Sequence, residues 1–151
     1  MTPVELPDST AGTLMLLLNA EAACAFDNIT RDGRVSQLKD QGRNAWPNSF
    51  RTSRLIPAVE YIRAQRARTL LCEQMHAAFA PYDVIVCPPY SHLGSTNLSG
   101  NPQVVAPCGF VKGMPQGLSF LGRLWDEGSP LRVALAYQSV TAWHTQRPPL
   151  K

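Results

Sequence analysis

The stretch Thr96–Arg123, TNLSGNPQVVAPCGFVKGMPQGLSFLGR, decides the fold of this chain. Two short apolar runs within it predict strands at about 103–107 and 116–122. Turn-forming residues at 112–115 lie between these runs, so the two strands can pair as an antiparallel hairpin. The segment therefore predicts two neighbouring strands of a β-sheet.

Glycine and proline residues mark the turns and strand ends of this segment. Gly100 and Gly109 permit turns that a Cβ atom would obstruct. Pro102 and Pro107 delimit the first strand, at positions where a sheet needs no backbone donor. Together with Phe110, these residues form a structural motif that we expect to serve as scaffold.

A third strand and three helices are predicted around this hairpin. Asp83–Cys87 (DVIVC) is a β-branched run closed by two prolines, the pattern of a strand that is covered on both faces. A helix at about 57–79 leads directly into it, and further helices are expected at about 10–30 and 129–145. We expect an α/β fold in which helices pack on a mixed sheet.

The apolar residues of the first helix recur at three- and four-residue steps, which predicts one buried stripe. Its members are Met15, Leu18, Ala22, Ala25 and Ile29. The polar segment that follows, Arg31–Asn44, is expected to be a connector with one short helical turn.

The composition is typical of a packed globular protein. The chain has 151 residues, of which 44% are hydrophobic and 17% charged, and this size suits one domain with a single core. We therefore expect residues 1–151 to form one unit. The N-terminus shows no basic region followed by an apolar run, and no apolar stretch approaches the ~18 residues of a membrane span. A cytoplasmic protein without a membrane partner is expected.

Six arginines crowd a stretch with few carboxylates, although the net charge is only +3. They are Arg43, Arg51, Arg54, Arg63, Arg66 and Arg68. A nucleic-acid surface is one explanation, and the solvated side of a helix, with Glu60 paired to Arg63, is the other. The second is favoured because the sequence pI of 8.8 is lower than that of a typical phosphate-tracking domain, so no nucleic-acid partner is expected.

The sequence contains no recognisable motif for binding a metal or a cofactor or for nucleophilic catalysis. The four cysteines lack C-x-x-C spacing and are interpreted as reduced core thiols, the histidines are scattered, and no glycine-rich phosphate loop follows a strand. Neither a metal nor a cofactor is expected. Ser36–Lys39 fits S-x-x-K without its companion motifs, which we interpret as a chance match. Asp126 and Glu127 precede the last helix, where carboxylates favour the helix dipole.

Three motifs occur in order along the chain: N-x-x-G-x-P at 97–102, P-x-G-F at 107–110 and G-x-P-x-G-L-x-F-x-G-R at 113–123. Their combination resembles the C-terminal motif of the amidase-signature family. Upstream, Arg54–Leu71 resembles the long helix that precedes this motif in relatives of the aminoacyl-tRNA amidotransferase A subunit. The final helix and tail match as well, so the resemblance covers nearly the whole chain.

The resemblance implies a carbon–nitrogen hydrolase that cleaves linear amides. Such enzymes use a lysine as base and two serines, one held in a glycine- and serine-rich stretch and the other attacking the carbonyl. This sequence holds no such stretch, and its lysines, Lys39, Lys112 and Lys151, lie in a connector, a turn and the last position. No catalytic residue can be carried over, and the segment alone is expected to be inactive.

The loop before the hairpin is expected to form one wall of the amide-binding pocket in the intact enzyme. Its candidate residues are Tyr90, Ser91, His92, Thr96 and Asn97. Some family members place an acidic substrate-binding residue shortly before N-x-x-G-x-P, and none occurs at 91–96 here. This departure disfavours a glutamine-specific amidotransferase and leaves the substrate open.

Two hypotheses of function follow. In the first, the chain is the C-terminal segment of an amidase and supplies scaffold and a pocket wall, while an N-terminal portion contributes the nucleophile. In the second, it is a non-catalytic interaction module or a split-amidase half. Exposed sheet edges would then recruit the missing N-terminal amidase portion or a second copy of the chain.

Overall fold

The structure is a computed structural model that describes residues 1–7 and 11–148. Its contacts divide the chain into two compact units, and the single domain expected from the length stays a prediction. We call Met1–Asp8 with Leu71–Lys151 the sheet unit, and Ser9–Leu70 the helical unit. The division falls within helix α4 (Ala58–Phe79), whose 22 residues span roughly 33 Å, which is long for one small core.

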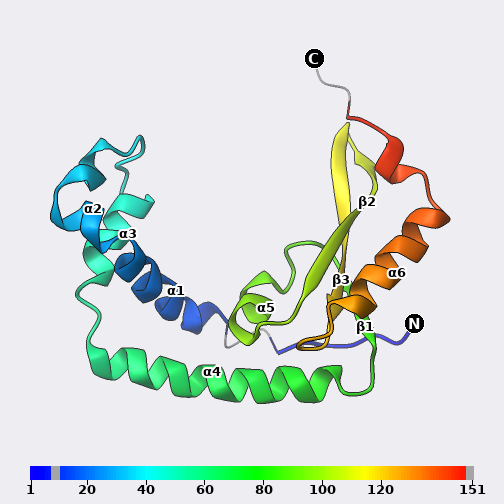
Figure 1. The fold of residues 1–151 in the computed structure, drawn as a ribbon, viewed down its shortest axis with the longest axis horizontal. Helices are drawn as coiled ribbons and strands as arrows, with labels where there is room; N and C mark the ends of the chain where they lie inside the picture. The colour runs from blue at the N-terminus through cyan, green and yellow to red at the C-terminus, as the bar shows by residue number, and fades with distance from the viewer. Residues whose placement is uncertain (8–10, 149–151) are drawn as a thin grey trace. The chain divides into compact units, whose positions relative to one another are not determined.

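The sheet unit contains three strands in the order β1-β3-β2 (Figure 1). They are β1 (Val84–Cys87), β2 (Gln103–Val111) and β3 (Met114–Gly122). All three predicted strands are present, and β2 and β3 form the expected antiparallel hairpin. The sequence favoured a mixed sheet, whereas both pairings among these strands are antiparallel, since β1 also runs against β3.

Strand β2 continues through Pro107, which the sequence placed at its end. Proline is tolerated there because β2 is an edge strand, so the missing donor costs no hydrogen bond of the ladder. The register shifts between Pro107 and Gly109, which leaves Cys108 as a bulge. Gly109 has φ +150°, and its Cβ position would meet no atom within 4 Å. Glycine is therefore needed for its backbone conformation and not for lack of space.

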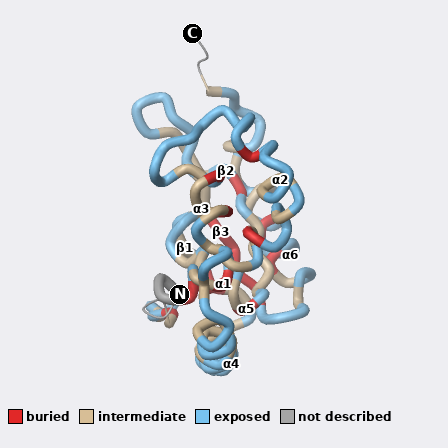
Figure 2. Tube along the Cα trace, turned by 90° about the vertical axis from the view of Figure 1, so that its left-hand side faces the viewer, coloured by how far each residue is buried: buried red, intermediate tan, exposed pale blue. Residues whose placement is uncertain are grey.

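One face of the sheet is covered by helix α6 (Gly128–Ser139) (Figure 1). Ala106, Phe120 and Ala134 form the core between them, with the rings of Phe120 and Tyr137 5.8 Å apart. Figure 2 shows buried stretches along β3, the central strand. At the far end of the hairpin, Phe110 contacts Trp143 edge to face, with ring centroids 6.5 Å apart.

The sequence predicted a single helix over 129–145, and the structure divides it into α6 and a 3-10 turn, η2 (Trp143–Thr145). Two β-branched residues, Val140 and Thr141, lie at the interruption and disfavour helix continuation. The Thr141 hydroxyl donates to the Tyr137 carbonyl at 2.9 Å, the acceptor that a continued helix would use.

The helical unit begins with α1 (Ala11–Ala25) and α2 (Asp27–Arg31), separated by a turn at Phe26. The sequence predicted one helix over 10–30, of which residue 10 lies outside the described residues. The buried positions are Leu14, Leu17 and Ala23, while Met15 and Leu18 are each 41% exposed. The predicted stripe was therefore wrong, because α1 is apolar on several sides and its spacing alone did not select the buried face.

A polar connector with the short 3-10 turn η1 (Arg34–Gln37) leads to α3 (Trp46–Ser53), a helix that the sequence pattern did not indicate. Pro47 lies in its first turn, and the Asn48 side chain donates to the carbonyls of Gln41 and Gly42 at 3.0 and 2.9 Å. The ring of Phe50 stacks on those of Trp46 and Phe26. The first part of α4 completes the unit.

Candidate functional site

The expected pocket-wall residues lie between β1 and β2, in the turns after Pro88 and in helix α5 (Leu93–Ser99). Tyr90 is 84% exposed, and Ser91 and Asn97 are also exposed. His92 is half-buried and Thr96 is buried. Solvent therefore reaches three of the five candidate side chains directly.

The structure distributes these candidates between two hollows. The first, which we call the β2 hollow, has a volume of about 580 Å³ and is bordered by Tyr90, Thr96, Asn97, Asn101, Gln103 and Val105, together with Pro89 and Leu93. The second, of about 470 Å³, contains His92 and is called here the N-terminal hollow. Ser91 borders neither of them. The five predicted residues thus do not converge on one place.

The polar wall of the β2 hollow is held by hydrogen bonds that the sequence did not indicate. The Gln103 side-chain nitrogen donates to the Pro89 carbonyl at 2.9 Å and to the Ser119 hydroxyl at 2.7 Å. Asn101 donates to the Gly122 carbonyl at 3.0 Å and accepts from the Ser99 hydroxyl at 2.6 Å. These bonds fix the loop after β1 and the end of α5 to the start of β2.

Thr96 has a structural role in this wall. Its hydroxyl donates to the His92 carbonyl at 3.0 Å, and its own carbonyl accepts from the backbone nitrogens of Gly100 and Asn101. Thr96 is only 1% exposed and its donor is used within the protein, whereas the exposed Asn97 carboxamide has no hydrogen-bond partner among the described residues.

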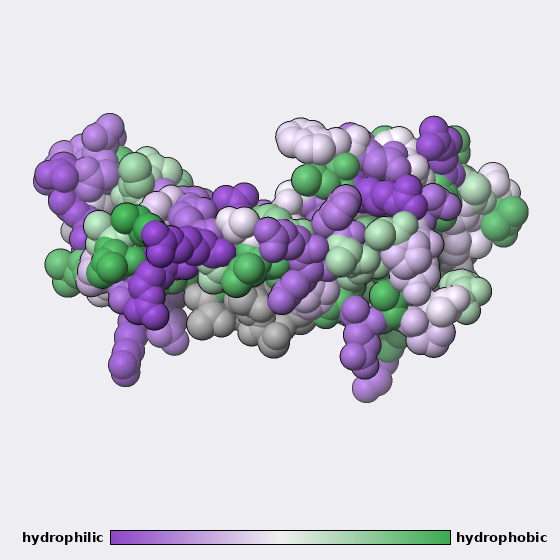
Figure 3. Space-filling view, turned by 90° about the horizontal axis from the view of Figure 1, so that it is seen from below, coloured by the Kyte–Doolittle hydropathy of each residue, from purple (hydrophilic) through white to green (hydrophobic). Residues whose placement is uncertain are grey.

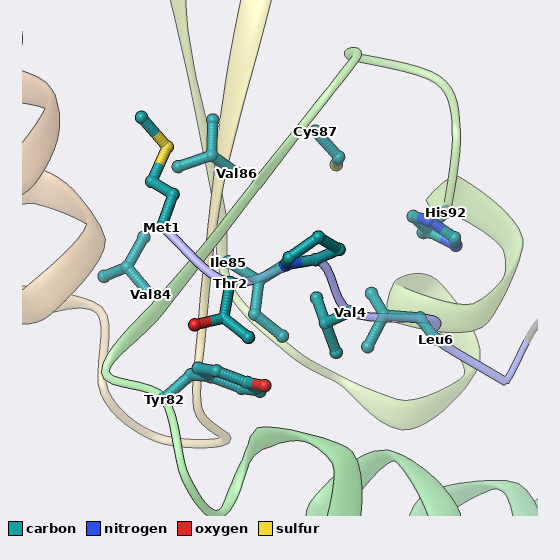
Figure 4. A pocket seen from close by; sticks show the side chains of 11 residues that line it. Met1, Thr2, Val4, Leu6, Tyr82, Val84, Ile85, Val86, Cys87 and His92 are labelled. Atoms are coloured by element: carbon teal, nitrogen blue, oxygen red, sulfur yellow. The ribbon is translucent and has the colours of Figure 1, made fainter.

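The N-terminal hollow lies between the segment Met1–Leu6 and strand β1 (Figure 4). Apolar side chains from both segments point into it, and His92 and Tyr82 lie at its border. The His92 Nδ1 atom is buried and has no hydrogen-bond partner among the described residues. Burial raises the pKa of the Cys87 thiol, which favours the protonated and less nucleophilic form.

The motif glycines position this region by backbone conformation and close packing. Gly100 has φ +84° and ends α5, and a Cβ there would lie 3.3 Å from Leu124. At Gly117 a Cβ would lie 2.9 Å from both the Pro89 ring and Val105 Cγ1. Pro102 accepts a hydrogen bond from the Gly122 nitrogen at 2.9 Å. The N-x-x-G-x-P and G-L-x-F motifs therefore hold the β2 hollow in shape.

Other candidates for chemistry occupy structural positions. Ser119 is fully buried and accepts the Gln103 bond. Ser36 accepts from Arg51 at 3.3 Å in the helical unit. Asp126 accepts from the Ser129 nitrogen at 3.0 Å before α6, and its hydrogen bonds with Ser129 lower the pKa of its carboxyl.

Among the described residues, no group of three histidine, cysteine or acidic side chains could hold a metal ion. The cysteines are unpaired, but Cys24 is exposed, so its interpretation as a core thiol was wrong. Within the part of the chain that the structure describes, no helix is long and apolar enough to cross a membrane. The arginine-rich stretch includes the expected Arg63–Glu60 pair at 3.2 Å on exposed helix surface.

The chain is similar in sequence to the A subunit of glutamyl-tRNA(Gln) amidotransferase from several bacteria. The protein from Roseiflexus castenholzii is 38% identical over 112 residues, which cover 60% of this chain and 23% of the relative. The protein from Halalkalibacterium halodurans is 37% identical over 111 residues, with the same coverage. This chain therefore matches less than a quarter of the length of these relatives. No family model matches the sequence.

Solved amidase structures contain a similar fold. The peptide amidase of Stenotrophomonas maltophilia superposes with a TM-score of 0.75 over 98% of this chain and 37% of its own, at 22% identity. A further amidase structure gives a TM-score of 0.78 over 92% of this chain and 37% of its own, at 17% identity. The A subunit of the Thermotoga maritima amidotransferase gives 0.53 over 82% of this chain and 33% of its own, at 19% identity.

The fold is that of the C-terminal part of amidase-signature proteins, as the three motifs predicted. Over 60% of its length, the chain is homologous to the amidotransferase A subunit, a member of the amidase-signature family. These findings confirm the recognition made from the motifs. The matched region is the C-terminal portion of those proteins, so the chain corresponds to a piece of an amidase-type hydrolase fold.

Proposed function

We propose that this chain acts as the C-terminal segment of an amidase-type carbon–nitrogen hydrolase and supplies its scaffold and one wall of the substrate pocket. The lysine base and both serines of the family's mechanism come from a portion that precedes these residues. The β2 hollow forms the pocket wall, with Tyr90, Thr96 and Asn97 on its surface. His92 borders the N-terminal hollow instead, and Ser91 borders neither hollow, so both lie outside this wall.

One observation carries this proposal. The first and third family motifs shape the β2 hollow, and none of the serines that line or support it is available as a nucleophile. Ser119 is fully buried beneath Gln103, and the Ser99 hydroxyl is buried and bonded to Asn101. Amide hydrolysis by a serine nucleophile needs a reachable hydroxyl next to a base, so a wall of this kind requires catalytic groups from elsewhere.

Activity-based labelling tests the proposal. The protein is treated with a fluorophosphonate, which forms a covalent adduct with activated serines, and is then digested and mapped by mass spectrometry. We expect no adduct on any peptide from residues 1–151, and a small amide substrate should compete for any label found outside this range. The variants Ser36→Ala and Ser119→Ala serve as controls and should leave the labelling pattern unchanged. An adduct on either serine, lost in the matching variant, would show that the proposal is wrong.

A second function, as an interaction module or split-amidase half, is favoured by the outer edge of β1. β1 has one strand neighbour, β3, and among the described residues no backbone hydrogen bond joins β1 to the N-terminal segment beside it. Val86, in the middle of this strand, is 42% exposed. Such an edge can accept a strand from an N-terminal amidase portion or from a second copy.

A further inference from the structure

The side chain of Gln103 is held in one orientation. Its nitrogen donates to two acceptors, the Pro89 carbonyl at 2.9 Å and the Ser119 hydroxyl at 2.7 Å. A carbonyl oxygen can only accept, so the group that faces Pro89 must be the NH₂ end of the carboxamide. This contact determines which end of Gln103 is oxygen and which is nitrogen.

The oxygen end of Gln103 is left free by this arrangement. Both hydrogens of its nitrogen are in use, whereas Oε1 has no hydrogen-bond partner among the described residues. Oε1 is also not one of the buried unpaired atoms found in the described chain. Gln103 therefore has a fixed, unpaired acceptor that is not fully buried, on a residue that borders the β2 hollow.

The surroundings of this acceptor are uncharged. The hollow is bordered by the apolar side chains of Pro89, Leu93 and Val105, of which Leu93 and Val105 are 41% and 53% exposed. The nearby Asn101 carboxamide uses both of its ends within the protein. None of the residues that border the hollow carries a charge. An ionic ligand would lose its hydration there without gaining a counter-charge.

From these observations, we propose that the β2 hollow binds uncharged amides with an apolar substituent, and that Gln103 positions them by accepting the amide N–H. The apolar substituent lies against Val105 and Leu93. A zwitterionic amide such as free glutamine is excluded, because neither its ammonium nor its carboxylate finds a partner. This inference rests on the proposed function, which it deepens by naming a substrate class.

Ligand titration tests the role of Gln103 independently of catalysis. Benzamide is added to the ¹⁵N-labelled protein, and dissociation constants are taken from NMR shifts of the Gln103 side-chain NH₂ and the Val105 amide. N,N-dimethylbenzamide has no N–H and serves as the matched ligand. In the unmodified protein, we expect benzamide to bind about three- to tenfold more tightly than the dimethyl compound, the range of one net hydrogen bond.

The same pair of ligands is then titrated against two variants of Gln103. Gln103→Met removes the acceptor, so the ratio between the two ligands should fall to about one. Gln103→Lys also lacks an acceptor but keeps donors for Pro89 and Ser119, and the same loss of discrimination between the two ligands is expected. Gln116→Met is the control, because Gln116 bonds only to neighbouring carbonyls on the exposed part of β3 and lies outside the hollow.

Several outcomes would overturn the inference. If benzamide still binds more tightly than N,N-dimethylbenzamide in both Gln103 variants, another group accepts the amide N–H. Tighter binding of glutamine or benzoate than of benzamide shows that the hollow prefers charge, and the absence of any benzamide shift at Gln103 or Val105 shows that it is not a binding site. Failure of the proposed function would appear separately, as fluorophosphonate labelling within residues 1–151.

Discussion

Gly122, at the end of β3, shows how a single missing side chain permits the contact between the sheet and α6. A Cβ at this position would lie 2.7 Å from the Asp126 carbonyl oxygen and 2.9 Å from the Pro130 ring. Pro130 is itself buried at the start of α6. The glycine near the end of the third family motif is thus a packing requirement.

We expect Gly122→Ala to lower the free energy of unfolding by about 1–3 kcal/mol, the usual effect of overpacking. Urea denaturation followed by circular dichroism measures it. Gly128→Ala is the matched control: its nearest neighbour would lie 3.7 Å away, at the first residue of α6. That change should leave stability unchanged or raise it by up to about 1 kcal/mol. Equal losses in both variants would contradict the packing argument.

Two cysteines should differ in reactivity. Burial raises the pKa of Cys87, so less of the reactive thiolate is present near neutral pH, while Cys24 is exposed. Iodoacetamide should therefore alkylate Cys24 well before Cys87. Peptide mapping at successive times measures the two rates. Faster modification of Cys87 in the folded protein would argue against its burial.

Asp126 should make stability depend on acid pH. Its hydrogen bonds with Ser129 lower its pKa below the ordinary value of 3.8, so the folded state favours the carboxylate. The resulting stability is present above the unfolded-state pKa and is lost as the pH falls through the folded-state pKa. Thermal midpoints between neutral pH and about pH 3 should therefore fall less in Asp126→Asn than in the unmodified protein. Parallel curves for the two proteins would contradict this role.

At the scale of elements, the β2–β3 hairpin depends on a two-residue turn. Lys112 and Gly113 have φ values of 50° and 80°, which fits a type I′ turn. Glycine adopts this conformation freely, but lysine does so at a cost, and asparagine is better suited.

We expect Lys112→Asn to raise the free energy of unfolding by about 0.5 kcal/mol through better turn propensity. Chemical denaturation measures the gain. Lys39→Asn, in the polar connector, is the control for loss of one lysine charge and should have no such effect. A destabilised Lys112→Asn protein would show that the lysine side chain itself supports the hairpin.

Some helices and strands could be predicted from the sequence and others could not. The helix at 57–79 and the three strands were predicted, because each is a continuous run with clear turn residues at its ends. The interruption at Phe26, the bulge at Cys108 and the helix α3 were not, because each depends on contacts between residues distant in sequence. The Phe26–Phe50 stack is one such contact.

For the molecule as a whole, many large hydrophobic side chains are exposed. Figure 3 shows hydrophobic side chains exposed among hydrophilic ones on one face. In α6 alone, Leu131 and Leu135 are 55% and 68% exposed. The chain matches less than a quarter of its relatives' length, and a partner portion would cover such surface.

We expect residues 1–151 on their own to self-associate through the outer edge of β1. Val86→Lys should raise the monomer fraction, because a charge on an edge strand opposes strand addition. Size-exclusion chromatography with light scattering gives the mass. Val140→Lys, which adds the same charge at an 81% exposed site outside the sheet, is the control and should not dissociate the assembly. A clean monomer in the unmodified chain would exclude association at this edge.

Local patterns were enough to identify the strands, the long helix and the amidase-signature motifs, because alternation, turn residues and motif spacing are properties of neighbouring residues. The family resemblance indicated Tyr90, Ser91, His92, Thr96 and Asn97 as one pocket wall, and the structure places three of the five, Tyr90, Thr96 and Asn97, at the β2 hollow. Their role in binding stays a prediction. Packing in three dimensions alone decided that His92 borders a different hollow and that Gln103, at the β2 hollow, uses its nitrogen within the protein and leaves its oxygen unpaired among the described residues. Both results depend on contacts between β1, α5 and β2. Residue spacing along the chain does not show which polar atoms remain unpaired after such contacts form.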